Sequence, residues 1–312
     1  LQLLLQTDPR ILVIEKFPGT NSPGVPPPPV LRNTDRVGFS DLLADPGGVV
    51  RRSLLFLSHG GRTGYAFSRQ LALAYLQAAG IHPAADEANP SHLRLGTVSL
   101  APLEGDEGGY VDADAGGYQI MLRYRDAPMP FQVHTLRDLH QGRIAPDAID
   151  GRIVILGVAA DSVKDHFTTP FAILDTSSGT IPGSAVHAHA AQLLLDAALT
   201  GGPPLRTWGD SAELAWVWLW VAIGFLAGWF AGPSWRFVLV VLAGVLCAVG
   251  VAAAAFLWGW WIPVVPNLLG WLFAAALSSA LLAAHRRRDQ QVLMSLFARH
   301  VSPEVAGAIW QR

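Results

Sequence analysis

Apolar residues are distributed unevenly, and the densest stretches lie toward the C-terminal end of the chain. Three long apolar runs cover residues 214–232, 237–258 and 262–284, and none of them contains Asp, Glu, Lys or Arg. Each run approaches the ~20 residues that a helix needs to cross ~30 Å of hydrocarbon. Short segments with Gly, Pro or Trp separate the runs. The pattern predicts three transmembrane helices joined by tight turns, rather than a helical hairpin buried in a large soluble core.

Shorter apolar patterns occupy the first part of the chain. Ile153–Leu156 is a continuous apolar run near glycines, which predicts a strand buried on both faces at the centre of a sheet. Residues 11–14 have a similar pattern. Along residues 117–125, large apolar residues alternate with a second set that includes Gln119. This alternation predicts a strand with one face buried and the other partly exposed to solvent. The residues before 208 are therefore expected to contain a sheet.

Two further segments, 67–79 and 184–199, carry apolar residues at helical spacing. The expected fold is an α/β extracytoplasmic sensor domain over residues 1–207, followed by an all-α three-helix transmembrane region over 208–285 and a cytoplasmic helix over 286–312. The expected inward faces of the two helices consist of Leu71, Ala74, Tyr75 and Ala78 in the first and of Val186, His189, Ala190, Leu193 and Ala197 in the second.

Basic residues near the ends of the apolar runs predict the membrane orientation. Arg236 lies in the first turn and Arg286, Arg287 and Arg288 follow the third run, whereas Arg206 precedes the first run and counts against the same sidedness. The larger cluster predicts that residues before about 213 are extracytoplasmic and residues after about 285 are cytoplasmic. We therefore expect a multi-pass protein of the cell membrane, with the lipid bilayer as one partner.

Composition excludes several classes of function. The chain is 51% hydrophobic and only 15% charged, with a formal net charge of −2, and its first two hundred residues show no basic stripe interleaved with aromatics. Nucleic acid is therefore not an expected partner. Cys247 is the only cysteine and lies within an apolar run, so one chain can build neither a disulfide nor a thiolate metal site.

Candidate ligand-binding residues follow the apolar run at 153–156. Asp161, Lys164, Asp165, Thr168 and Thr169 gather in this segment. Ligands of open α/β sheets bind at the carboxyl ends of strands, so these side chains are the first place to expect a bound signal. The structural alternative is that Asp165 and the threonine hydroxyls only accept hydrogen bonds from turn amides.

Catalytic, metal and cofactor sites are not expected in this chain. His187 and His189 form an H-x-H pair, but the helical pattern around them turns the two rings to different sides, so packing explains them better than metal binding. We find no G-x-S-x-G nucleophile motif and no P-loop. The chain itself is therefore expected to lack enzymatic activity and to need no cofactor.

Five short motifs follow one another in the first part of the chain. They are Asp45–Arg52; Gly117–Ile120 with Tyr124 and Arg125; Arg152–Gly157; Asp165 with Thr169–Phe171; and Ile181–Gly183 ahead of Val186–His189. In this order and spacing they resemble the second type of CHASE domain, the cyclase/histidine-kinase-associated sensory extracellular module. Three membrane spans directly after the domain fit the same pattern. The resemblance implies a sensor for an unidentified extracytoplasmic ligand or protein, and it implies that a first portion of the domain precedes Leu1.

The end of the chain carries a second, shorter resemblance. Residues 297–305 are similar to the segment that precedes the catalytic domain of bacterial class III adenylate/guanylate cyclases. This implies a cyclase domain beyond Arg312 and a homodimer, because such cyclases form their active sites between two domains. A histidine or Ser/Thr kinase output and a non-enzymatic membrane scaffold are the alternatives. The expected signal relay consists of Arg286, Arg287, Arg288, Phe297, Ser302 and Pro303.

Overall fold

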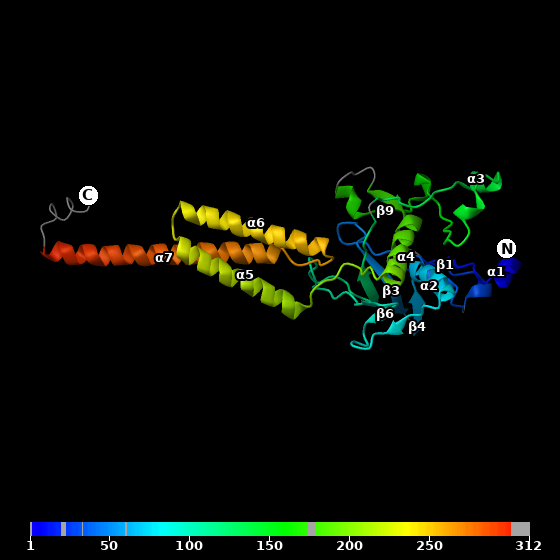
Figure 1. The fold of residues 1–312 in the computed structure, drawn as a ribbon, viewed down its shortest axis with the longest axis horizontal. Coiled ribbons are helices and arrows are strands. Elements are labelled where there is room, and N and C mark those ends of the chain that lie inside the picture. Colours follow the sequence, from blue (N-terminus) through cyan, green and yellow to red (C-terminus); the bar gives the residue numbers. More distant parts are fainter. Residues whose placement is uncertain are drawn as a thin grey trace. The chain divides into compact units, whose positions relative to one another are not determined.

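The computed structural model describes residues 2–19, 23–32, 34–59, 61–125, 127–173 and 179–300. It divides into two compact units (Figure 1). The first unit contains Leu1–Gly105 and Asp112–Arg206, and the second contains Asp106–Val111 and Thr207–Arg312. The short segment Asp106–Val111 thus interrupts the sequence of the first unit but belongs to the second unit.

The first unit is a mixed α/β structure, as the sequence predicts. Its helices are α1 (Gln2–Thr7), α2 (Phe67–Ala78), α3 (Leu136–His140) and α4 (Gly183–Thr200). Its strands are β1 (Val13–Glu15), β2 (Val37–Phe39), β3 (Arg52–His59), β4 (Arg62–Tyr65), β5 (Ala84–Ala85), β6 (Leu93–Leu95), β7 (Val98–Leu100), β8 (Tyr118–Met121), β9 (His166–Thr168) and β10 (Thr180–Pro182).

The strands form four small sheets. The order β4-β3-β8 builds one antiparallel sheet, and β5-β6-β7 builds another. A parallel pair, β1 and β2, and an antiparallel pair, β9 and β10, complete the set. Strand β1 overlaps the strand predicted at 11–14 only at Val13 and Ile14, and Ile14 is 51% exposed, so this strand is not buried on both faces as predicted.

The main core packs α2 and α4 against the β3 and β8 strands. Val50, Leu55, Ile120 and Leu194 are buried in this core. All five predicted inward residues of α4 are buried, which confirms that face. The predicted face of α2 was wrong except at Leu71, because Ala74, Tyr75 and Ala78 are exposed while Ala72 and Leu76 are fully buried.

The predicted central strand at 153–156 was wrong. These residues belong to no strand. Ile153 and Ile155 pack against the main core, but Val154 is 54% exposed and Leu156 is 86% exposed. A strand requires a neighbour to take its backbone hydrogen bonds, and no strand pairs with this segment among the residues that the structure describes.

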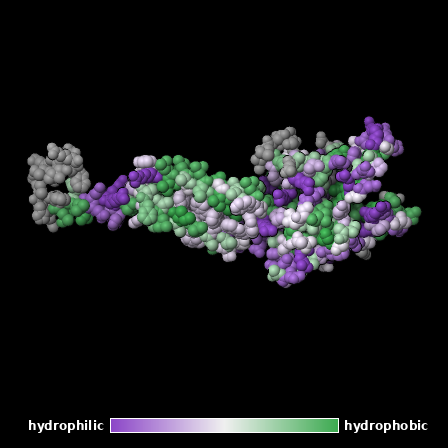
Figure 2. All heavy atoms as spheres, viewed as in Figure 1, coloured by the Kyte–Doolittle hydropathy of each residue, from purple (hydrophilic) through white to green (hydrophobic). Residues whose placement is uncertain are grey.

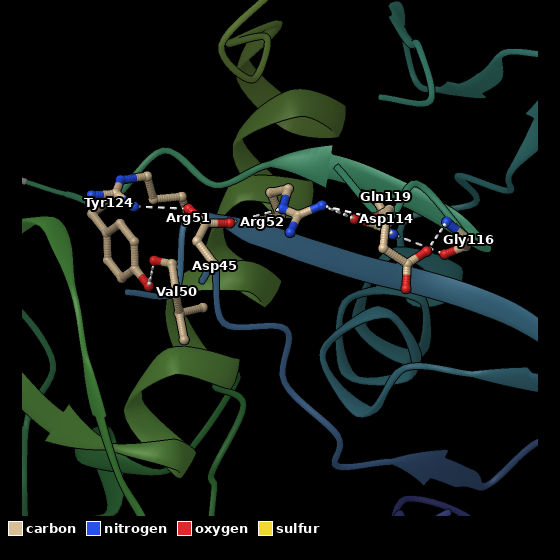
Figure 3. A network of polar contacts seen from close by, with 8 residues as sticks. All are labelled: Asp45, Val50, Arg51, Arg52, Asp114, Gly116, Gln119 and Tyr124. Atoms are coloured by element: carbon tan, nitrogen blue, oxygen red, sulfur yellow. Dashed lines mark hydrogen bonds and ion pairs between the residues drawn. The ribbon is translucent and has the colours of Figure 1, made fainter. Parts of the chain in front are cut away.

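Strand β8 also differs from its prediction, because the face that carries Gln119 is not exposed to solvent. All four of its residues are buried, and Gln119 is only 1% exposed. Its amide oxygen accepts a hydrogen bond from Arg52 Nη1 at 2.9 Å, and its amide nitrogen donates to the carbonyls of Asp114 and Gly116 at 2.9 and 2.8 Å (Figure 3). A buried polar side chain is tolerated here because its hydrogen bonds are made.

Arg52 and its neighbour Arg51 join this amide to a turn that begins at Asp45. Arg52 Nε donates to Asp45 Oδ1 at 3.1 Å and Arg51 Nη1 donates to Asp45 Oδ2 at 2.8 Å (Figure 3). The turn closes through a hydrogen bond from Gly48 N to Asp45 O at 2.7 Å, and Gly48 has the left-handed φ of 77° that favours glycine. The network ties the turn to β3 and β8 within the first unit.

The second unit contains three helices that are long and apolar enough to cross a membrane, which agrees with the sequence analysis. They are α5 (Asp210–Ala231), α6 (Trp235–Leu257) and α7 (Val265–His300). On the face that Figure 2 shows, hydrophobic residues predominate over this bundle, and a hydrophilic segment follows it along α7. The first part of α7 is thus the third apolar run, and the same helix continues into the polar segment.

Small residues let α5 and α7 approach each other closely. A Cβ at Gly224 would lie 2.7 Å from the carbonyl oxygen of Trp271, and a Cβ at Gly228 would collide with Ala275. On α6, Gly244 makes room for the Trp271 ring. Small residues at such crossings increase van der Waals packing, which drives helix association in lipid.

Candidate signal-transmission site

The segment Asp106–Val111 binds the start of α5, and we call it the docking loop. Gly108 N donates to Glu213 Oε1 at 2.6 Å. Thr207 Oγ1, which lies just before α5, donates to Glu107 Oε2 at 2.6 Å. Both acceptors are carboxylates, and hydrogen bonds to charged acceptors are among the stronger ones in proteins. The loop is therefore held to the beginning of the first apolar helix.

Trp261 supplies an aromatic surface for the same loop. The ring of Tyr110 meets Trp261 edge to face, with 5.2 Å between the ring centroids. A Cβ at Gly109 would lie 2.7 Å from Trp261 Cζ2, so the backbone approaches the indole as closely as only glycine allows. Gly108 has a φ of 67°, which also favours glycine. The two glycines thus let the loop lie flat on the ring between α6 and α7.

The docking loop is a second covalent connection between the two units. The chain leaves the first unit after Gly105 and re-enters it at Asp112, in addition to its final passage after Arg206. A hydrogen bond from Ala113 N to Gly105 O, at 3.0 Å, closes the base of the loop within the first unit. The chain therefore passes between the two units on both sides of the loop as well as after residue 206.

A row of indole rings runs from the start of α5 into the bundle. Trp208 contacts Trp216, Trp216 contacts Trp220, and Trp220 contacts Trp271 on α7, with centroid separations of 5.7, 5.7 and 5.9 Å and nearly perpendicular rings. Edge-to-face aromatic pairs have preferred geometries. The row therefore connects the start of α5 to α7 by direct ring contacts.

The opposite end of the bundle holds the predicted relay. Arg286 lies beside Gly232 in the turn between α5 and α6, where a Cβ at Gly232 would lie 3.6 Å from its Nη1. Arg287 and Arg288 follow on the same uninterrupted helix. Phe297 also lies on α7, whereas Ser302 and Pro303 lie outside the described residues. The structure thus places Arg236, the second residue of α6, and the 286–288 cluster at one end of the bundle.

The predicted ligand-binding residues lie in the first unit, around β9. Lys164 is exposed with a φ of 54°, and Asp161 begins a short 3-10 turn. The Asp165 carboxylate lies beside Gly183, the first residue of α4, where the helix dipole favours a negative charge. Thr168 ends β9. Thr169 is fully buried, and its Oγ1 donates to Gly179 O at 2.9 Å. Asp165 and Thr169 therefore have structural roles, and ligand binding at this segment stays a prediction.

Comparison with known families identifies the N-terminal region. The sequence matches the CHASE2 domain family over residues 2–226. The chain belongs to this family. CHASE2 domains are sensory extracellular domains, and the match covers the first unit, the docking loop and most of α5. Comparisons with curated proteins and with solved structures found no match.

The two histidines of the CHASE2 region lie on α4 and point to different neighbours. His187 Nε2 lies 3.3 Å from Ser40 O, and His189 Nε2 lies 3.0 Å from Pro128 O. Burial lowers the pKa of both imidazoles. Among the described residues no group of three or more His, Cys, Asp or Glu side chains could hold a metal ion. The H-x-H pair is thus part of the packing around α4.

Sequence analysis missed the docking loop, although the residues carry a weak signal. Gly108, Gly109 and Tyr110 form an apolar patch between acidic residues, and Glu213 is an acidic residue next to an apolar run. Either feature alone is typical of an ordinary surface turn or helix start. Only the structure shows that the loop contacts Glu213 and Trp261.

Proposed function

We propose that this chain is the sensory and membrane-anchoring portion of a transmembrane receptor that controls a class III adenylate/guanylate cyclase domain following Arg312. The observation that carries the proposal is the single helix α7, which runs from Val265 through the apolar run and the 286–288 cluster to His300 without a break. A continuous helix transmits rotation and translation along its axis. The likeness of residues 297–305 to the segment ahead of such cyclase domains supports the choice of output.

The CHASE2 domain lies outside the cell in this proposal, and the end of α7 lies in the cytoplasm. A signal that changes the conformation of the first unit moves the docking loop and the start of α5, and the indole row and the close α5–α7 packing pass this displacement to α7. The receptor acts as a homodimer, because the cyclase active site needs two domains. The signal shifts the equilibrium only by its differential affinity for the two conformations.

The test changes the helical phase of α7, which is the rotation of its downstream part relative to its upstream part. The complete protein, with the residues beyond Arg312, is assayed in membrane vesicles for formation of cyclic AMP and cyclic GMP. Insertion of one alanine after Gln290 rotates everything downstream by about 100°, whereas seven inserted residues restore the phase to within about 20°. We expect the single insertion to change cyclase activity severalfold and the seven-residue insertion to restore it.

Glu213→Ala tests the loop contact at the start of α5, with Asp210→Ala as the matched control. Asp210 is exposed in the first turn of α5, whereas the Glu213 carboxylate accepts the hydrogen bond from the docking loop. We expect only Glu213→Ala to shift the basal cyclase activity. A complete protein that forms no cyclic nucleotide, or one that is indifferent to helical phase, would contradict the proposal.

A further inference from the structure

A surface hollow of about 300 Å³ lies in the first unit, apart from the 161–169 segment and the docking loop. This volume is at the lower end of the range of small-molecule sites, ~300–1,000 Å³. Most of its wall is apolar or aromatic, and α2 contributes one cation. The lining residues are Phe56, Thr63, Tyr65, Arg69, Pro83, Ala84, Ala85 and Leu93.

The cation is Arg69, and no carboxylate pairs with it among the residues that the structure describes. Its Nη1 donates to Gln70 Oε1 at 3.0 Å, and its guanidinium lies over the Tyr65 ring, 4.2 Å from the centroid. Its Nε is buried without a hydrogen-bond partner. Burial lowers the pKa of Arg69. Arg69 is partly buried, and a partly desolvated charge without an anion is unfavourable, so an anionic ligand should bind more tightly here than at a fully exposed arginine.

The aromatic wall is fixed by its own contacts. Tyr65 meets Phe56 edge to face at 6.3 Å, and Phe56 stacks on Tyr118 at 4.6 Å. The Tyr118 hydroxyl accepts a hydrogen bond from Leu93 N at 2.7 Å and donates to Leu100 O at 2.6 Å. These bonds attach the ring column to β6 and β7. The hollow is thus pre-formed, which reduces the entropy that a ligand must overcome on binding.

We propose that this hollow binds a small carboxylate with a single aromatic ring, whose carboxylate pairs with Arg69 and whose ring packs against Tyr65, Phe56 and Leu93. A guanidinium recognises a planar carboxylate through paired N–H donors. The apolar lining disfavours ions such as phosphate, because they have no apolar surface that could pack against it. The inference deepens the sensory role by naming a ligand class, and it rests on that role but not on the cyclase output.

Binding of benzoate to the full chain in lipid nanodiscs tests the inference by isothermal titration calorimetry. The controls are benzamide, which is neutral, and acetate, which lacks the ring. We expect roughly millimolar or tighter binding of benzoate and at least about tenfold weaker binding of both controls, since each lacks one half of the recognition. Absence of benzoate binding, or equal binding of acetate or inorganic phosphate, would overturn it.

Two variants assign the binding to the hollow. Arg69→Gln removes the cation, and Ala84→Trp fills the hollow from an exposed edge position without touching the arginine. Both should weaken benzoate binding at least about tenfold, whereas Arg123→Gln at an exposed arginine should leave it unchanged. Unchanged binding in either hollow variant refutes the site. Because no output domain is needed, this result is independent of the cyclase assay.

Discussion

Removal of the Asp45 carboxylate perturbs the buried network of the first unit most directly. The side chains of Asp45 and Arg52 are each 6% exposed, whereas that of Arg51 is 33% exposed. Asp45→Ala removes this carboxylate from the buried Arg52 guanidinium, which keeps its hydrogen bonds to the Asp114 carbonyl and the Gln119 amide oxygen. Arg51→Gln, in contrast, removes the more exposed of the two ion pairs and leaves Asp45 with Arg52.

The two substitutions should therefore differ strongly in their effect on stability. Removing one partner of a buried ion pair costs about 3–5 kcal/mol, whereas a pair with one more exposed partner, such as Arg51, contributes less, about 0–1 kcal/mol. In a unit of about 200 residues, 1 kcal/mol shifts the melting temperature by roughly 2–4 °C. We expect Asp45→Ala to lower the melting temperature of the first unit by roughly 10 °C and Arg51→Gln by no more than about 4 °C.

Thermal proteolysis measures this difference. All eleven tryptophans lie at or after Trp208, so tryptophan fluorescence reports mainly on the membrane unit. A short protease pulse at rising temperature, followed by detection of the intact first unit, reports on the network instead. Equal melting temperatures for Asp45→Ala and Arg51→Gln would refute the reasoning that buried charge pairing stabilises this turn.

Two further predictions concern α4 and the bundle. Burial lowers the folded-state pKa of His187 below its unfolded value, so its contribution to stability is present above ~6.5 and is lost as pH falls below that value. The melting temperature of the first unit should fall between pH 7.5 and 5, and less steeply in His187→Gln; equal slopes would contradict this. Gly228→Leu should separate α5 from α7 and destabilise the bundle by about 1–3 kcal/mol, whereas Gly250→Leu, which meets nothing within 4 Å, should not. Thermal aggregation in detergent compares the two, and equal loss would count against the close helix contact.

The membrane helices and α4 were predictable because their signals are local. A long uncharged apolar run can satisfy its backbone in lipid only as a helix, and the regular spacing of Val186, Ala190, Leu193 and Ala197 needs no knowledge of the rest of the chain. The strand expected at 153–156 failed because a strand depends on a partner elsewhere in the sequence. An apolar run alone does not reveal whether that partner lies alongside it.

The sites were less predictable, because they depend on residues distant in the sequence. Gln119 is buried only because Arg52 and the carbonyls near it satisfy its amide. Glu213 meets Gly108 across more than one hundred residues. No periodicity or motif encodes such a meeting, so sequence analysis could place the membrane region but not the loop that binds it.

Sidedness is the most direct test of the central claim, that a sensor outside the membrane is connected by α7 to the cytoplasm. In a Cys247→Ala background, single cysteines replace Gln77, exposed on α2, or Gln290, exposed on α7 beyond the apolar run. Intact cells are treated with a membrane-impermeant maleimide. We predict labelling at 77 in intact cells and at 290 only after permeabilisation. Labelling at 290 in intact cells, or none at 77, would contradict the account.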